Sequence, residues 1–188
     1  MLENIEMLEV VDENDVVIEI EERNKIHELG LLHREVHVIF VTPKREIIFQ
    51  HREKNKSSMP NKLDATVGGH LDPGENIAAA AIREAKEETG VVISENELLF
   101  AGKVRSNIYE EKIKIRNNVI RYCYGYLYSG KLEDLKIEEG KIIGFVKYDF
   151  ESLKNLNEEE KEKFIPERYE KTYMDIYEEI FGKLVLNK

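Results

Sequence analysis

Residues 68–91, GGHLDPGENIAAAAIREAKEETGV, constrain the fold of this chain more than any other stretch of its sequence. Pro73 and Gly74 are typical of a turn, and the run IAAAAIREAKEE consists mainly of strong helix formers. Gly90 follows this run, at the position where a glycine ends many helices. The segment therefore predicts a short strand, a loop with a turn, and a helix that stops at Gly90.

The predicted helix carries three glutamates close together. Glu84 precedes Glu87 and Glu88 by three and four residues, so their side chains are neighbours on a helical surface. Like charges at these offsets destabilise a helix by roughly 0.2–0.5 kcal/mol per pair. Such pairs often lie on a solvated helix face. Clustered carboxylates are also the hard oxygen ligands that Mg²⁺ and Mn²⁺ prefer, and a bound cation would offset the repulsion.

Composition limits the class of protein. The 188 residues are 41% hydrophobic and 35% charged, which fits one compact soluble domain with a terminal extension. A single cysteine, Cys123, excludes an intrachain disulfide and leaves no cysteine cluster for zinc. The start, MLENIEMLEV, lacks the features of a secretory signal, and no segment approaches the roughly 18 apolar residues that span a bilayer. We expect a cytoplasmic protein with no membrane partner.

The charge balance limits the partners. Lys and Arg total 28 against 38 Asp and Glu, which gives a net charge of −10. An acidic surface disfavours broad binding to the phosphate backbone of nucleic acid. A local basic cluster or a bound metal can still invert the field of one cleft. The expected partners are therefore small anionic ligands and cations, and not nucleic acid.

The order of patterns along the chain predicts an α+β fold, with helices packed on a mixed sheet. Residues 8–20 and 35–52 are typical of two hairpins, separated by a short helix that ends at Gly30. Residues 51–62 form a polar loop before a short strand within 64–70. Three further strands are expected over 98–109, 117–130 and 141–150.

Beyond residue 150 the pattern becomes helical. Its apolar residues lie mostly on one stripe: Phe164, Tyr169, Tyr173, Ile176, Ile180 and Leu184. We predict a single domain over 1–188, with an N-terminal hairpin and short helix over 1–33, a core over 34–150 and a helical extension over 151–188. The extension can cap the core of its own subunit or contribute to a homodimer.

The spacing of residues 69–91 resembles the Nudix box, the signature of the Nudix hydrolase family: G-x5-E-x7-R-E-U-x-E-E-x-G-U, where U is a bulky aliphatic residue. Gly69, Glu75 and every other fixed position match. The one departure is Ala85, which is smaller than the usual aliphatic residue but removes no ligand. The resemblance implies an α/β/α sandwich around a mixed sheet, and Mg²⁺-dependent (or Mn²⁺-dependent) hydrolysis of a diphosphate linkage in a nucleoside-diphosphate-type or related small molecule.

Carried over by position, the resemblance implies a metal site. Its ligands are the carboxylates of Glu84 and Glu88, the carboxylate of Glu87 directly or through water, and the backbone carbonyl of Gly68.

The resemblance also implies groups that act beside the metal. Arg83 would orient the glutamates through ion pairs, and Glu75 would interact with that arginine. The base that activates the attacking water varies in the family, and is either the glutamate matching Glu84 or one on a later loop, where this chain offers Glu138 and Glu139. The predicted catalytic set is Arg83, Glu84, Glu87 and Glu139.

The resemblance extends over roughly residues 8–150 to the branch that includes isopentenyl-diphosphate isomerase and its hydrolase-like relatives. Members of that branch contact phosphate through an arginine and a lysine four residues later, which implies substrate binding by Arg52 and Lys56. The isomerase has a catalytic cysteine where this chain has Gly68, and a glycine can neither donate nor accept a proton. Gly68 thus argues against the isomerase. An isomerase-like enzyme and a non-catalytic nucleotide-binding module are the two alternatives to a hydrolase.

Three histidines leave another question open. His70 matches the metal-binding histidine of the isomerase, and His33 and His37 lie near the region of its other histidines. A second metal site is one interpretation. The other is that these are packed or hydrogen-bonded structural residues.

Overall fold

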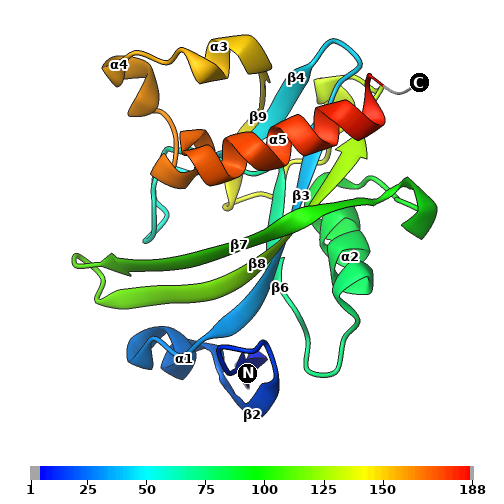
Figure 1. Ribbon diagram of the computed structural model, residues 1–188. Coiled ribbons are helices and arrows are strands. Elements are labelled where there is room, and N and C mark those ends of the chain that lie inside the picture. Colours follow the sequence, from blue (N-terminus) through cyan, green and yellow to red (C-terminus); the bar gives the residue numbers. More distant parts are fainter. Residues whose placement is uncertain (1–4, 187–188) are drawn as a thin grey trace.

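The computed structural model of the protein describes residues 5–186, and its nine strands form one mixed sheet (Figure 1). β3 (His33–Val41) lies at the centre of the sheet. It pairs parallel with β8 (Ile115–Leu127) and antiparallel with β4 (Glu46–Arg52), β6 (Val67–His70) and β1 (Met7–Val11). Four other strands extend the sheet: β2 (Val17–Glu22) beside β1, β7 (Leu99–Glu110) beside β8, and β5 (Leu63–Asp64) and β9 (Ile142–Asp149) beside β4.

Five α-helices accompany the sheet in the described residues: α1 (Arg23–Leu29), α2 (Ile77–Thr89), α3 (Phe150–Lys154), α4 (Glu158–Lys161) and α5 (Lys171–Leu184). Three short 3₁₀ turns complete the regular structure: η1 (Glu95–Glu97), η2 (Leu132–Asp134) and η3 (Pro166–Tyr169). Among residues 5–186, no helix combines the length and the apolarity needed to cross a membrane.

Alternation along β3 gives the sheet two buried faces. Val36, Val38 and Phe40 pack in a core with the buried alanines of α2. Ile39 and Val41 point the other way, into a second core with α5. Figure 1 shows these two helices on different sides of the central strands. The predicted α+β sandwich is confirmed.

Helix α2 begins and ends where the sequence predicts. The side chain of Asn76 caps its first turn by accepting hydrogen bonds from the backbone N–H groups of Ala78 (2.9 Å) and Ala79 (3.2 Å). Gly90 ends the helix in the left-handed conformation, with φ of 75°. Ala85 is fully buried, so the small residue in the box brings the helix close to the sheet.

Both predicted hairpins and the short helix between them are present, and Gly30 ends that helix with φ of 68°. The single strand expected within 64–70 is instead two strands. Side-chain hydrogen bonds interrupt it, because the Asp64 carboxylate accepts from its neighbour Ala65 and the Thr66 hydroxyl accepts from the backbone N–H of Phe40 on β3. The chain then resumes as β6, which aligns the box glycines with β3.

The helical stripe expected beyond residue 150 is only partly helical. Phe164 lies in a bridge with Leu63, and Tyr169 ends η3, which begins at Pro166. Proline has no backbone N–H and therefore favours a helix start over a helix interior. The long helix begins only at Lys171.

The N-terminal hairpin joins the sheet through the pair Val10–His33 and contacts the box loop. The Glu9 carboxylate accepts a hydrogen bond from the backbone N–H of Gly74 (2.8 Å) and forms an ion pair with Arg34 (3.2 Å). The hairpin thereby supports the loop that precedes α2. The division of the chain into one domain with segments 1–33, 34–150 and 151–188 stays a prediction, and residues 1–4 and 187–188 lie outside the described part.

Candidate metal-binding site

Arg83 organises the acidic residues of α2 and its preceding loop. Its guanidinium donates to both carboxylate oxygens of Glu75, at 2.9 and 2.8 Å. One terminal nitrogen also donates to Glu84 (2.8 Å) and, at the limit of hydrogen bonding, to Glu87 (3.5 Å). The other donates to the backbone carbonyl of His70 (3.0 Å). Arg83 therefore fixes the position of Glu84 relative to the end of β6.

Two glycines of β6 let the glutamates approach the strand. A Cβ atom at Gly69 would lie 2.1 Å from Cδ of Glu84, so any larger residue would displace that carboxylate. The neighbouring Gly68 donates its backbone N–H to Glu88 (3.1 Å). Glu84 and Glu88 thus converge on the Gly68–Gly69 backbone, while the Glu87 side chain is 59% exposed at the margin.

Burial without sufficient countercharge perturbs both inner carboxylates. Burial raises the pKa of Glu88 to about 8, although the Gly68 hydrogen bond opposes the shift and the charge of Glu84 adds to it. Burial also raises the pKa of Glu84, against the opposing effect of Arg83. A divalent cation would reverse both shifts, because it favours the charged form of each carboxylate. An oxygen-only donor set on a rigid helix fits Mg²⁺ or Mn²⁺.

The two glutamates of the 136–141 loop differ in their surroundings. Glu138 is half-buried and forms an ion pair with Lys141 (2.7 Å), and its charge contributes to the raised pKa of Glu88 after the larger effect of burial. Glu139 is exposed. The charges of both Glu138 and Lys141 therefore influence Glu88, in opposite directions.

The two predicted phosphate-binding residues occupy one loop in different ways. The Arg52 guanidinium forms an ion pair with Asp64 (3.3 Å) and donates to the backbone carbonyls of Met59 (3.1 Å) and Ser58 (3.0 Å). It therefore shapes the 53–62 loop. Lys56 lies on that loop, and partial burial together with the positive charges of Arg52 and Lys141 lowers its pKa. The charges of Glu138 and Glu88 oppose this shift, so the Lys56 ammonium is influenced by both the 136–141 loop and the box.

Histidines form a second group that could hold a metal ion. One ring nitrogen from each of His27, His33 and His70 lies within 4.8 Å of the others. Neither ring nitrogen of His27 has a hydrogen-bond partner, and Nδ1 of His33 bonds the Leu31 carbonyl (3.0 Å), which leaves Nε2 of His33 unpartnered. Glu35 lies 3.5 Å from Nε2 of His70.

The structure separates His37 from this group, since its Nδ1 bonds the Tyr173 hydroxyl (2.9 Å). Sequence reasoning missed His27, which lies on α1 and has no motif around it. The sequence carries a signal only for the other members of the group: strand alternation and pairing put His33, Glu35 and the box histidine His70 on one face of β3 and β6. Burial lowers the pKa of His33 to about 4, so this imidazole is neutral, the form that binds metals.

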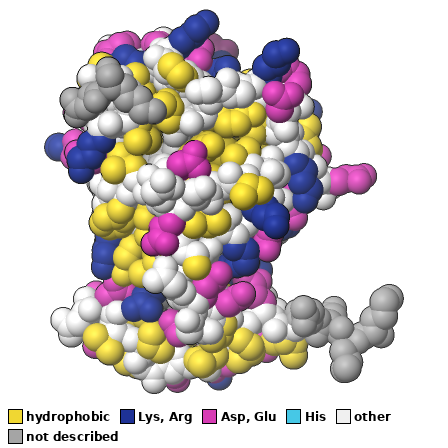
Figure 2. Space-filling model, turned by 90° about the vertical axis from the view of Figure 1, so that its right-hand side faces the viewer, with side chains coloured by type: hydrophobic (Ala, Val, Ile, Leu, Met, Phe, Trp, Pro, Cys, Tyr) yellow, Lys and Arg dark blue, Asp and Glu magenta, His cyan; other side chains and the backbone are white. Residues whose placement is uncertain are grey.

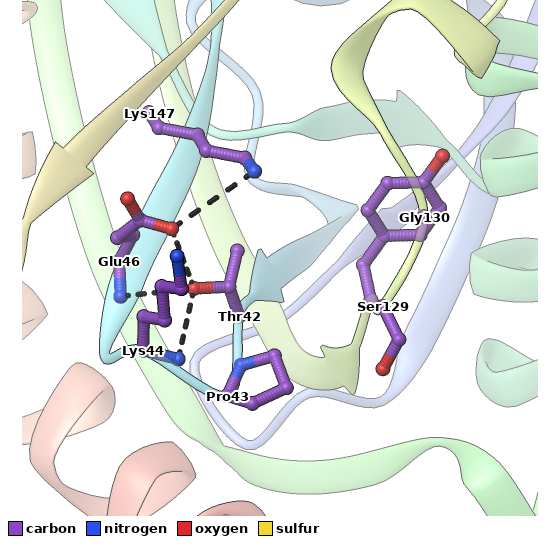
Figure 3. Close-up of a pocket in the computed structure, with 8 residues that line it drawn as sticks. Thr42, Pro43, Lys44, Glu46, Ser129, Gly130 and Lys147 are labelled. Atoms are coloured by element: carbon purple, nitrogen blue, oxygen red, sulfur yellow. Dashed lines mark hydrogen bonds and ion pairs between the residues drawn. The ribbon is translucent and has the colours of Figure 1, made fainter.

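A cavity of about 270 Å³ is lined by neither the box carboxylates nor the three histidines (Figure 3). Its lining residues are Thr42, Pro43, Lys44, Glu46, Tyr128, Ser129, Gly130 and Lys147. Thr42 follows the last residue of β3, whereas His70 pairs with Glu35 near the start of that strand.

Figure 2 shows the side of the molecule that carries α2, where acidic and basic side chains are mixed over the described residues.

Comparison with known proteins supports the resemblance to the Nudix family that the sequence motif indicates. A model of the NUDIX domain matches residues 31–168. An uncharacterized Nudix hydrolase of Clostridium acetobutylicum is 34% identical over 156 residues, which cover 79% of this chain and 72% of that protein. In other curated relatives the matching stretch spans about half of the protein, 48% and 47% in two of them.

Two solved structures share the fold. A Deinococcus radiodurans protein has a TM-score of 0.60 at 23% identity, over 80% of this chain and 87% of that chain. A MutT protein from Methanosarcina mazei has a TM-score of 0.58 at 19% identity, over 84% and 96%. The fold, the acidic helix and these matches define one class of enzyme. The chain belongs to the Nudix family of pyrophosphohydrolases.

Proposed function

We propose that the protein is a Mg²⁺- or Mn²⁺-dependent Nudix hydrolase that cleaves a diphosphate linkage in a nucleoside-diphosphate-type or related small molecule. One observation carries this proposal: the complete box converges on β6, where Glu84 fills the space that Gly69 leaves open and Glu88 accepts a hydrogen bond from Gly68.

The proposed metal ligands are Glu84, Glu88, the backbone carbonyl of Gly68 and, directly or through water, Glu87. A divalent ion bound there would polarise phosphoryl oxygens and lower the pKa of a bound water. Arg83 would hold the ligands in place, because it joins Glu84 and Glu87 to the carbonyl at the end of β6.

The proposed base is Glu84 or a glutamate of the 136–141 loop. The sequence offers both Glu138 and Glu139, of which Glu139 is in the predicted catalytic set, and the influence of Glu138 on the pKa of Glu88 supports Glu138 as the other candidate. Proposed substrate contacts are Lys56, whose pKa responds to the charges of Glu138 and Glu88, and Arg52, which would have to share its guanidinium with Asp64 and the 53–62 loop.

A substrate panel tests the proposal. Purified protein is incubated with Mg²⁺ or Mn²⁺ and a series of nucleoside-diphosphate derivatives, and products are separated by chromatography. We expect turnover of at least one compound, its loss in EDTA, and a fall of at least about 100-fold in Glu88→Gln, because a lost ligand should cost no less than the 10–100-fold typical of outer-shell groups. Glu111→Gln, an exposed change on the β7–β8 hairpin, is the matched control. Turnover that is equal in Glu88→Gln and wild type would refute the proposal.

The histidine group favours one alternative, an isopentenyl-diphosphate isomerase-like enzyme with a second metal. Gly68 speaks against it, since no side chain there can move a proton. Incubation with isopentenyl diphosphate, followed by NMR, distinguishes them: an allylic product supports the isomerase. A non-catalytic nucleotide-binding module would instead bind a panel compound without any product.

Assembly and location also remain predictions. We expect a cytoplasmic protein, and a homodimer is the assembly that the C-terminal helix could support. Light scattering of the purified protein measures its mass in solution and separates a dimer from a monomer of 22.0 kDa.

A further inference from the structure

The 136–141 loop spans the space between the end of α2 and the 53–62 loop. At one end, Lys136 donates its backbone N–H to the carbonyl of Thr89 (2.9 Å) and its ammonium to the carbonyl of Glu87 (3.0 Å). At the other end, the carbonyl of Lys141 accepts from the backbone N–H of Glu53 (3.0 Å). The loop is therefore fastened at both ends, to α2 and to the 53–62 loop, so the side chains between these points have restricted positions.

Lys141 directs a positive charge at this site. Its ammonium forms an ion pair with Glu138 (2.7 Å), and the side chain is 54% exposed. Burial alone would lower the pKa of Lys141, but Glu138 and the charges of Glu88 and Glu84 raise it. The effect is mutual, since Lys141 opposes the rise in the pKa of Glu88. Arg83 supplies the countercharge of Glu84 through an ion pair (2.8 Å), whereas the charge of Lys141 opposes the raised pKa of Glu88 as a smaller effect.

A cation beside metal ligands has two physical consequences. It competes with a divalent ion for the same carboxylates, because the two positive charges repel. It also attracts an anion that arrives with the metal, since a lysine has a flexible stem that can move its charge over several ångströms. The Arg52 guanidinium is engaged by Asp64 and two loop carbonyls. Because Arg52 is engaged in this way, a diphosphate that is to meet two cations at this site needs one cation in addition to Lys56.

We propose that Lys141, on the loop fastened between α2 and the 53–62 loop, is a substrate-binding residue: its ammonium pairs with Glu138 in the metal-free protein and contacts a phosphoryl oxygen when divalent ions occupy Glu84 and Glu88. This inference rests on the proposed function, and it adds a residue outside the box to the site. It makes opposite predictions for metal and for anion. Removing the charge strengthens binding of the ion and weakens binding of the diphosphate.

Titration of Lys141→Gln tests both effects without turnover. The probes are Mn²⁺, followed by electron paramagnetic resonance, and methylenediphosphonate, a diphosphate analogue with no cleavable bridge, added by calorimetry in saturating Mn²⁺. We expect the Kd for Mn²⁺ to fall by about threefold to tenfold, since a nearby like charge is removed. We expect the Kd for methylenediphosphonate to rise by about tenfold, the scale of one charge-assisted contact.

Two control variants accompany it. Lys141→Arg keeps the charge and should restore both constants to within about threefold of the wild type. Lys171→Gln makes the same change of charge at an 87% exposed side chain of α5, outside this loop, so both constants should stay within about twofold. Because the side chain of Lys141 is half-exposed, we expect its substitution to leave the fold intact, and circular dichroism checks this directly.

Each outcome decides the inference. Opposite changes in the two constants support it, including the case in which the wild type binds both probes but hydrolyses no compound of the panel, which would overturn only the proposed hydrolysis. Unchanged constants in Lys141→Gln, or a shift of both in the same direction, overturn the role of Lys141 and leave the hydrolase proposal intact. If the wild type binds no Mn²⁺, both fail together.

Discussion

At Gly69 the backbone of β6 leaves room for a carboxylate instead of a side chain of its own. A methyl group at this position would meet the end of the Glu84 side chain at 2.1 Å, and that end can swing away. We therefore expect Gly69→Ala to keep its fold and to lose Mn²⁺ affinity by about 10–100-fold, the range for groups that hold metal ligands in place. Mn²⁺ titration measures the affinity, and urea unfolding measures the stability.

Gly182→Ala is the matched control for this substitution. Nothing lies within 4 Å of a Cβ at Gly182, which is inside α5, so alanine there should raise helix stability slightly and leave Mn²⁺ binding unchanged. Wild-type Mn²⁺ affinity in Gly69→Ala would contradict the placement of Glu84 as a ligand.

Glu88 gives a prediction for pH. Burial raises its pKa from the ordinary 4.5 to about 8, so the folded state keeps a proton that the unfolded state has already released. The unfolded state binds fewer protons between these values, and the free energy of unfolding must fall as pH rises from about 4.5 to about 8. The contribution is at most about 5 kcal/mol, from roughly 1.4 kcal/mol per unit.

The lowered pKa values of the buried His27 and His33 also make the stability depend on pH, so the difference between two proteins isolates the contribution of Glu88. Urea unfolding of the wild type and of Glu88→Gln in EDTA, at pH 5, 6, 7 and 8, should show a gap that changes with pH. Saturating Mg²⁺ should remove the pH-dependent loss in the wild type, because the ion favours the charged carboxylate. If the difference in unfolding free energy between the two proteins did not change with pH, the pKa of Glu88 would be close to its ordinary value of 4.5.

At the scale of elements, η3 connects the C-terminal segment to the strands around the site. Its Arg168 is buried and donates to Asp64 on β5 (2.8 Å), which also forms an ion pair with Arg52 (3.3 Å). Its neighbour Glu167 pairs with the buried Arg121 of β8 (3.0 Å). The C-terminal segment therefore supplies charges that the sheet and the 53–62 loop need.

Removing one partner of this buried network should be costly. We expect Arg168→Met to lower the free energy of unfolding by about 3–5 kcal/mol, because the Asp64 carboxylate stays buried with less countercharge. The double variant Asp64→Asn, Arg168→Met should recover part of the loss. Lys171→Met changes an exposed ion pair nearby and should have no measurable effect. Urea unfolding measures all three variants, and a loss in Arg168→Met no larger than that in Lys171→Met would contradict the role of this pair.

For the whole molecule, sequence spacing predicts contacts that are local and misses those that the fold brings together. Arg83 and Glu75 meet because eight residues of loop and helix separate them. The pair Arg168–Asp64 joins residues 104 positions apart, and no local pattern predicts it. The same limit applies to His27, which reaches the box histidine only because the N-terminal hairpin and α1 pack beside β3. Arg52 matches a binding motif, but its bonds to the loop depend on where Asp64 lies.

Across the whole molecule, two donor sets of different chemistry lie on either side of the β6 backbone. The carboxylates of α2 suit a hard cation, whereas the three imidazoles suit a borderline transition metal such as Co²⁺ or Zn²⁺. We expect one Co²⁺ to bind at the histidines even when Mg²⁺ saturates the carboxylates. Titration with Co²⁺ in excess Mg²⁺, followed by its visible absorption, measures this site.

The variant that separates a metal site from simple packing is His27→Phe. Neither ring nitrogen of His27 has a hydrogen-bond partner, so a similar-sized apolar ring should leave the metal-free protein as stable as the wild type or more stable. The same change should abolish the Co²⁺ spectrum and the stabilisation by Co²⁺, whereas Glu88→Gln should keep both. If His27→Phe kept the wild-type Co²⁺ spectrum, these histidines would be packing residues. The Co²⁺ would then be bound at the carboxylates of α2.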